Sequence, residues 1–259
     1  MSNRINVMWF VPLPLAVLAG QAPGATVIQP SRNPSSDAQF EALVAGEVDA
    51  VVTAMDNVIG WNRRSGPKDF RVVAQVERTT PLALIAARDR KSMADLRGTN
   101  LLVDAVDNGF VIALRAMLRE AGVDEDGCRF TAAGGVTERY EALLEGRGDA
   151  TLLGQPFATQ AAKAGLVQIA SVPQAYPAFP GQGIVMRTAS PARERIGAWL
   201  CELEQARLQI QDPDSLRPTD EGVALLIEHR RLLGLPGGED AYSDVVDTSL
   251  LATFLGNDQ

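Results

Sequence analysis

Short apolar runs alternate along the chain with segments of helical periodicity, the order expected of an α/β protein. Runs rich in β-branched residues predict strands over residues 5–10, 26–29, 49–54, 71–76 and 82–87. Apolar residues three and four positions apart predict helices over residues 13–19 and 37–45, and a helix from Asn57 that ends by Gly66. Strands and helices that alternate over short connections favour parallel-rich sheets flanked by helices.

The alternation continues over the second part of the chain. Further strands are predicted over residues 100–104, 128–131, 150–153, 167–170 and 183–187. Further helices are predicted over residues 110–121, 156–164, 191–209, 218–233 and 239–254. The last third of the chain is therefore expected to be mainly helical.

One segment of the chain occurs twice, one hundred residues apart. Residues 40–50 (FEALVAGEVDA) and 140–150 (YEALLEGRGDA) are identical at six of eleven positions. In each copy a helical apolar pattern ends at a glycine, Gly46 or Gly146, that suits a left-handed helix cap, and an Asp-Ala pair then leads into a short strand. A repeated helix–glycine–strand unit predicts two lobes of similar build. Chance similarity is the alternative, because these short motifs are common.

We therefore expect two α/β lobes that face each other across a cleft. The first lobe comprises residues 1–87 and is completed by residues 183–259, whose C-terminal helices pack onto it; the second comprises residues 88–182. Residues 173–183 hold three prolines and two glycines and are typical of a returning crossover. Clefts between lobes are common places for small ligands.

Composition and charge exclude several classes of function. With 46% hydrophobic and 22% charged residues, the 259-residue chain has the composition of an ordinary soluble protein with no membrane span. A net charge of −8 without a Lys/Arg run argues against a nucleic-acid partner. Cys128 and Cys201 fit no metal or redox spacing, and the single histidine, His229, is expected to be solvated or capping rather than catalytic. We therefore expect no metal and no cofactor.

The order and spacing of several motifs resemble a known family. They are Leu43-x-x-Gly46-x-x-Asp49-Ala50, Ser92-x-x-Asp95-Leu96-x-Gly98, a long helix ending in Glu120-Ala-Gly-Val123, Leu144-x-Gly146-x-x-Asp149-Ala150, and Gln155-Pro156. Over about residues 5–235 the pattern resembles the type 2 periplasmic-binding-protein fold, in particular the NMT1/THI5-like group of sulfonate-binding and thiamine-pyrimidine-precursor proteins. The resemblance implies a two-lobed fold with a ligand cleft and leaves the ligand open.

Two functions are consistent with this resemblance. The first is a non-catalytic binder of a small polar organic ligand, either a solute receptor or a cytoplasmic carrier or sensor; an ABC-transporter permease is the implied partner if the protein is exported. The second is a decarboxylase- or lyase-type enzyme that uses a cleft carboxyl, Asp56 or Asp104, as acid and base. No nucleophile–base constellation is evident in the sequence, so catalytic residues are left unassigned.

The N-terminal segment admits two interpretations. Residues 5–19 form an apolar stretch behind Arg4 and resemble a signal-peptide core, but Pro12 and Pro14 interrupt them. Residues 5–10 also have the pattern of a first strand, whose removal would expose a large apolar area. We therefore expect an uncleaved, buried parallel strand and a cytoplasmic protein, with the periplasm as the alternative.

The candidate ligand-binding residues follow strands or open helices, where ligands bind in such sheets. They are Phe10, Arg32, Asp56, Asn57, Asp104, Gly134, Gly135, Thr137 and Gln155. Asp56 and Asn57 are expected to form hydrogen bonds with donor and acceptor groups of the ligand, or alternatively to cap a helix. Replacement of Asp56 by Ala is expected to weaken ligand binding and to leave folding nearly intact.

The remaining candidates each have a structural alternative. The turn from Gly134 to Thr137 has backbone N–H groups suited to an anion, although glycines before a helix are also ordinary turn residues. Arg32 follows a strand and suits an anionic ligand, with a solvated loop residue as the alternative. Phe10 is a candidate for an apolar wall, or for the core. Arg139 is expected to form a surface or interlobe pair.

Overall fold

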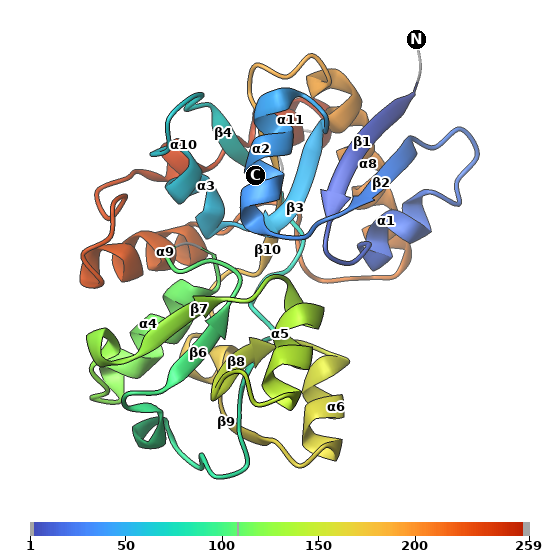
Figure 1. Cartoon of the computed structure of the whole chain (residues 1–259). Coiled ribbons are helices and arrows are strands. Elements are labelled where there is room, and N and C mark those ends of the chain that lie inside the picture. Colours follow the sequence, from blue (N-terminus) through green and yellow to red (C-terminus); the bar gives the residue numbers. More distant parts are fainter. Residues whose placement is uncertain (1–2, 108, 256–259) are drawn as a thin grey trace.

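The computed structural model describes residues 3–107 and 109–255 and contains two five-stranded sheets, one in each of two lobes (Figure 1). Residues 1–2, Asn108 and residues 256–259, which the predicted lobes included, lie outside the described part. The α/β, two-lobed fold class predicted from the sequence is confirmed. In the described part of the chain, no helix has the length and apolarity needed to cross a membrane.

The first sheet has the strand order β2-β1-β3-β10-β4. Its strands are β1 (Arg4–Trp9), β2 (Val27–Arg32), β3 (Ala50–Ala54), β4 (Phe70–Gln75) and β10 (Gln182–Arg187). Strand β1 is parallel to both neighbours and buries Ile5, Val7 and Trp9, so it forms part of the fold as predicted. Strand β10 is antiparallel to β3 and β4.

The second sheet has the order β7-β6-β8-β5-β9. Its strands are β5 (Ala83–Ala86), β6 (Asn100–Val103), β7 (Arg129–Ala132), β8 (Ala150–Leu153) and β9 (Val167–Ser171). Strand β5 is antiparallel to β8 and β9, so both sheets are mixed, with half of the strand pairs antiparallel. Residues 82–87 were assigned to the first lobe, but β5 pairs within the second sheet, because pairing partners and not local periodicity decide which sheet a strand joins.

Helices cover the sheets of both lobes (Figure 1). They are α1 (Pro14–Ala19), α2 (Ser36–Ala45), α3 (Asp56–Trp61), α4 (Val111–Glu120), α5 (Val136–Leu144), α6 (Phe157–Lys163), α7 (Val172–Ala175), α8 (Arg193–Gln209), α9 (Asp220–Leu232), α10 (Tyr242–Val245) and α11 (Ser249–Leu255), with 3-10 turns η1 (Met93–Leu96) and η2 (Glu125–Gly127). Helix α8 packs on α1 and α11 of the first lobe, and its Trp199 and Leu200 are buried there.

The C-terminal helices differ from the prediction in two ways. Helix α9 packs against α4 of the second lobe, so the C-terminal third does not contact the first lobe alone. The single helix predicted over residues 239–254 is two helices, because Val246 forms a parallel bridge with Val72 of β4 between them. A helix cannot continue through a residue whose backbone joins a sheet.

The two copies of the repeat occupy equivalent positions in the two lobes. Gly46 and Gly146 end α2 and α5 with φ values of 72° and 71°. Asp49 accepts a hydrogen bond from the Asn6 backbone N–H, and Asp149 accepts one from the Asn100 backbone N–H, each at 2.8 Å. The equivalent environments indicate that each lobe is built around the same helix–turn–strand unit.

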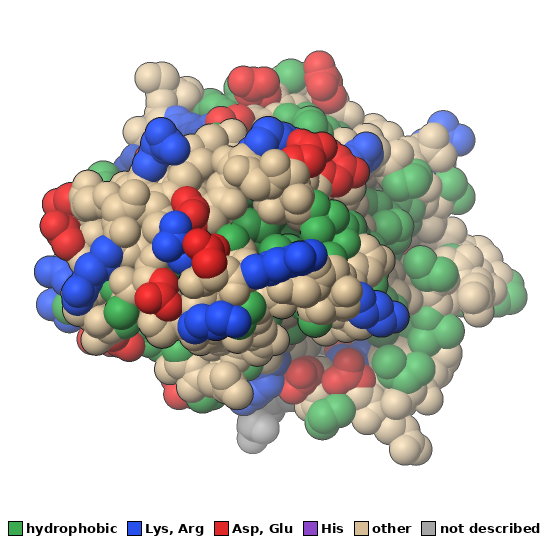
Figure 2. All heavy atoms as spheres, turned by 60° about the horizontal axis from the view of Figure 1, so that its bottom comes forward, with side chains coloured by type: hydrophobic (Ala, Val, Ile, Leu, Met, Phe, Trp, Pro, Cys, Tyr) green, Lys and Arg blue, Asp and Glu red, His purple; other side chains and the backbone are tan. Residues whose placement is uncertain are grey.

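Charged side chains of both signs are interspersed on the face of the molecule shown in Figure 2. The net charge of −8 is therefore not gathered into one acidic surface on that face.

Candidate functional site

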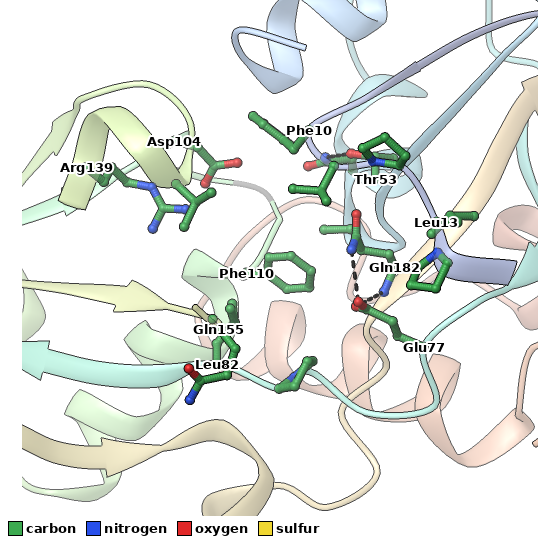
Figure 3. Close-up of a pocket in the computed structure, with 18 residues that line it drawn as sticks. Phe10, Leu13, Thr53, Glu77, Leu82, Asp104, Phe110, Arg139, Gln155 and Gln182 are labelled. Atoms are coloured by element: carbon green, nitrogen blue, oxygen red, sulfur yellow. Dashed lines mark hydrogen bonds between the residues drawn. The ribbon is translucent and has the colours of Figure 1, made fainter. Parts of the chain in front are cut away.

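A cavity of about 310 Å³ lies where the two sheets face each other (Figure 3). This volume is at the lower end of the roughly 300–1,000 Å³ of ligand pockets, which suits a metabolite-sized molecule. Its walls come from the ends of strands and from the crossovers between the lobes. The lining residues are Phe10, Val11, Pro12, Leu13, Pro14, Thr53, Ala54, Asn57, Glu77, Pro81, Leu82, Asp104, Phe110, Val136, Arg139, Gly154, Gln155 and Gln182.

Arg139 and Asp104 form the charged wall of the cavity, on the second lobe (Figure 3). Arg139 lies on α5 and is only 8% exposed. Its Nη1 donates to the Leu152 carbonyl at 2.6 Å and to Thr151 Oγ1 at 3.1 Å, whereas its Nε has no hydrogen-bond partner among the described atoms. Burial lowers the pKa of the Arg139 guanidinium, and the charges of Asp104 and Glu138 oppose this. The arrangement leaves a buried cation with an unused donor.

Asp104 directly follows β6, at the edge of the second sheet that faces the cavity. Burial raises the pKa of its carboxyl group, and the attraction of Arg139 opposes the rise only in part. Asp37, on α2 of the first lobe, adds a like charge that raises this pKa further.

At the positions of the first lobe that are equivalent to Arg139 and Asp104, the repeat holds uncharged residues. Gln39, one hundred residues before Arg139, donates from Nε2 to the Val52 carbonyl of β3 at 2.9 Å, as Arg139 donates to the Leu152 carbonyl of β8. The strand registers extend the equivalence: Val7 pairs with Ala50 and Leu101 with Ala150, which makes Phe10 the counterpart of Asp104. At these equivalent positions the molecule is therefore asymmetric: Asp104 and Arg139 line the cavity from the second lobe and Phe10 lines it from the first, whereas Gln39 is fully buried and does not line it.

Glu77 and Gln182 lie at the crossovers that join the lobes. The Glu77 carboxylate accepts hydrogen bonds from the Gln182 backbone N–H at 3.1 Å and from its Nε2 at 3.0 Å (Figure 3). Burial raises the pKa of Glu77, and these two bonds oppose the rise. The crossovers are also tied by Thr80, whose Oγ1 donates to the Pro180 carbonyl at 2.8 Å.

Apolar side chains form most of the remaining wall. The phenyl rings of Phe10 and Phe110 come from opposite lobes and both line the cavity (Figure 3). Leu82, which directly precedes β5, also lines it. Thr53 accepts a hydrogen bond from Asn57 Nδ2 at 2.7 Å, which holds that amide on the wall. A mainly apolar wall with a few fixed polar groups is the usual composition of a small-molecule site.

Four of the nine candidate residues line this cavity, namely Phe10, Asn57, Asp104 and Gln155. The other five lie outside its walls. Asp56 is 1% exposed and forms a bidentate ion pair with Arg230, with nitrogen–oxygen distances of 2.7 and 2.8 Å. It also accepts a hydrogen bond from the Gly109 backbone N–H at 2.8 Å, so both carboxylate oxygens are occupied by protein groups.

Arg32 and the turn around Gly134 lie at the rim. Arg32 forms an exposed ion pair of 2.7 Å with Glu138 of the other lobe. Phe10 lies so close to Gly135 that a Cβ there would be 2.8 Å from the ring, so a larger residue would displace the ring. The 134–137 turn, with Thr137, is therefore covered by Phe10 on one side and opens α5 on the other.

Sequence reasoning missed Arg139, Glu77 and Gln182 as cavity residues. The repeat held the signal for Arg139, because Gln39 and Arg139 occupy the same position in the two copies and one of them carries a charge. No comparable signal marks Glu77, which reaches the cavity only because two crossovers run side by side.

His229 is buried at 3% exposure, in contrast to the solvated or capping role expected. It packs against Tyr176 and Phe179, with ring centroids 4.5 and 5.6 Å away, because α9 lies over the crossover region. Among the described residues, no group of three His, Cys, Asp or Glu side chains is placed to hold a metal ion.

A family model described as "ABC transporter, phosphonate, periplasmic substrate-binding protein" matches residues 2–226. Among curated proteins, no sequence matches the chain significantly.

Solved structures share the fold at low sequence identity. The ligand-binding component of an ABC-type import system from Staphylococcus aureus, solved with zinc bound, has a TM-score of 0.80 and 11% identity, with 98% of this chain and 99% of that chain covered. The alkanesulfonate-binding protein of Xanthomonas axonopodis pv. citri, bound to MOPS, has a TM-score of 0.65 and 15% identity over 91% and 81%. PhnD1 of Prochlorococcus marinus, in complex with methylphosphonate, has a TM-score of 0.61 and 10% identity over 90% and 99%.

These findings bear on the alternatives left by the sequence. They support a substrate-binding protein that binds a small ligand, and they do not support the decarboxylase or lyase alternative. They also support the periplasmic alternative in place of the cytoplasmic location that we expected, because the family is periplasmic. The chain belongs to the phosphonate-binding family of periplasmic substrate-binding proteins of ABC transporters.

Proposed function

We propose that this protein is a receptor that binds a small organic oxyanion with a short apolar body and presents it to an ABC-transporter permease. The observation that carries the proposal is Arg139, a guanidinium only 8% exposed on the cavity wall with an unpartnered Nε. A buried charge is unfavourable without compensation, and a carboxylate, sulfonate or phosphonate group in the cavity supplies the opposite charge to the guanidinium.

The start of α5 supports an anion at the same wall. The helix begins at Val136, which lines the cavity, and its N-cap residue, Gly135, supplies no side-chain cap. The first N–H groups of a helix lack intrahelical partners and carry partial positive charge; the Glu138 carboxylate in the first turn already offsets part of it, so this contribution is secondary to that of Arg139.

The asymmetry of the cavity orients the ligand. The charged group faces Arg139 on the second lobe, and the apolar body lies toward Phe10, Phe110 and Leu82. Two of the structurally similar proteins are described with ligands of this chemistry, one as alkanesulfonate-binding and one with methylphosphonate. The cavity of about 310 Å³ limits the ligand to a short body.

Isothermal titration calorimetry with short-chain alkyl sulfonates, phosphonates and carboxylates tests the proposal. The key variant is Arg139→Gln, because Gln39 shows that glutamine at the equivalent position keeps the tether to the neighbouring strand. Loss of a hydrogen bond to a charged group, about 1.5–3 kcal/mol, predicts an affinity loss of roughly ten- to one-hundredfold.

The matched control is Arg115→Gln. Arg115 is also on a helix of the second lobe and is partly buried, but it pairs with Glu125 away from the cavity. It should leave affinity unchanged. Equal binding by wild type and Arg139→Gln, with both variants folded, would contradict the proposal.

A further inference from the structure

The charges that face the cavity do not match a ligand with two negative charges. Its walls carry one guanidinium, that of Arg139, and two carboxyl groups, those of Asp104 and Glu77. The guanidinium offsets one negative charge, and each further charge on the ligand adds to its repulsion by the carboxyl groups. A second negative charge would lie in a confined space together with the two carboxyl groups.

Asp104 is the cavity carboxyl group whose charge acts on Arg139, where the proposed oxyanion binds. It and Arg139 also line a second, smaller void of about 10 Å³, whose other walls are apolar residues such as Leu102 and Phe110. A void of this size holds about one water molecule. Like charges that share a desolvated space repel strongly, because little solvent screens them.

Asp104 differs from the residue at the equivalent position of the first lobe. The equivalent position of the first lobe holds Phe10, so the carboxyl group is not required by the repeated helix–strand unit. Burial raises the pKa of Asp104 despite the opposing charge of Arg139, and Asp37 contributes in the same direction.

We propose that Asp104 is a specificity-determining residue that restricts the cavity to oxyanions with a single negative charge, such as a sulfonate or carboxylate, and discriminates against a doubly charged phosphonate. This inference rests on the proposed binding of an organic oxyanion at Arg139. The phosphonate in the family's description is a property of the family and does not define the charge that this cavity accepts.

The test compares an alkyl sulfonate and an alkyl phosphonate with the same alkyl group by calorimetry. At about pH 9.5 the alkyl phosphonate carries two charges, although its second pKa is higher than the value of about 6 for a phosphate ester. The wild-type protein is expected to bind the sulfonate about tenfold or more tightly than the phosphonate. Asp104→Asn, which removes charge at constant shape, should narrow this ratio by about tenfold, chiefly through tighter phosphonate binding.

The control is Asp107→Asn, which removes one charge from the same loop at a side chain that does not line the cavity. It should leave the ratio unchanged. Circular dichroism and sulfonate affinity report whether each variant is folded, and Asp104→Ser provides a second neutral variant if Asp104→Asn unfolds.

The outcomes separate the two proposals. Equal or tighter binding of the doubly charged phosphonate by the wild type, or a ratio unaffected by both neutral variants, overturns the role of Asp104 while oxyanion binding stands. Failure of the wild type to bind any of the sulfonates, phosphonates or carboxylates overturns the proposed function and this inference with it.

Discussion

The buried ion pair between Asp56 and Arg230 is expected to hold the two lobes together. Asp56 opens α3 of the first lobe, and Arg230 lies on α9. Asp56 accepts the backbone N–H of Gly109, and Arg230 Nη2 donates to the Asp107 carbonyl at 3.2 Å, so both partners also bond to the loop that follows β6 of the second lobe. Replacement of Asp56 by Ala therefore affects the interlobe contact and not only one helix.

The magnitude follows from burial. The side chains of Asp56 and Arg230 are 1% and 2% exposed. Burial would lower the pKa of Arg230, but the charge and hydrogen bonds of Asp56 raise it above its usual value, so the carboxylate stabilises this charge in the fold. Removal of one partner of such a pair costs about 3–5 kcal/mol, because the other charge stays buried without compensation. This is a large part of the 5–15 kcal/mol that stabilises a typical domain.

A double-mutant cycle measured by urea unfolding tests this expectation. Asp56→Ala should lower the free energy of unfolding by about 3–5 kcal/mol, whereas Asp56→Ala combined with Arg230→Met should recover most of the loss, because no unpaired charge remains. Asp37→Ala is the control, since its pair with Arg64 is 64% and 32% exposed and should contribute at most about 1 kcal/mol.

The result that would refute this reasoning is an Asp56→Ala protein within about 1 kcal/mol of the wild type, or a double variant as unstable as the single one. The first of these outcomes is the one that sequence patterns alone predict for Asp56.

Three further expectations follow from the structure. Gly46→Ala and Gly146→Ala should each lower the unfolding free energy by about 1–2 kcal/mol and by similar amounts, because both glycines have positive φ and open space around an added Cβ; unequal urea midpoints at equal slope would contradict the equivalence. Burial lowers the pKa of His229 below its usual 6.5, although the attraction of Glu120 opposes this, so near and below that pH the unfolded state binds more protons than the folded state. The contribution of the buried neutral imidazole to stability is therefore lost as the solution becomes acidic. The stability advantage of the wild type over His229→Gln should shrink between about pH 8 and pH 5, and a constant difference in urea titrations would argue against this. Deletion of residues up to Trp9 should abolish soluble folding, because β1 is paired on both sides and buried; a soluble, folded truncated protein by circular dichroism would show that the strand is dispensable.

The fold was largely predictable because its signals are local. Helix caps, glycines and apolar periods act over a few residues, and they placed β1, β3, β8 and the helices between them within a few positions of their observed bounds. The repeat extended these local signals to the whole molecule, since two copies of one unit imply two lobes that face each other.

The candidate site was less predictable because a loop at a strand end can face the cavity or be filled by the protein itself. Asn57 and Asp104 line the cavity, while their neighbour in sequence, Asp56, is occupied by Arg230, which lies 174 residues away. No pattern around Asp56 indicates that partner. Arg139 was assigned to a surface or interlobe pair, because its position in a polar helix turn gave no sign that α5 would bury it against β8.

The sequence by itself determined the two repeated α/β units, the strand and helix order, and an acidic composition with a single histidine, because composition and short-range periodicity are properties of the unfolded chain as well. Tertiary structure alone decided which sheet β5 joins, which carboxylate faces the cavity and which is paired, and that Arg139 is buried with an unused donor. These features depend on contacts between residues far apart in the chain, and such contacts form only when the two lobes and the C-terminal helices pack together.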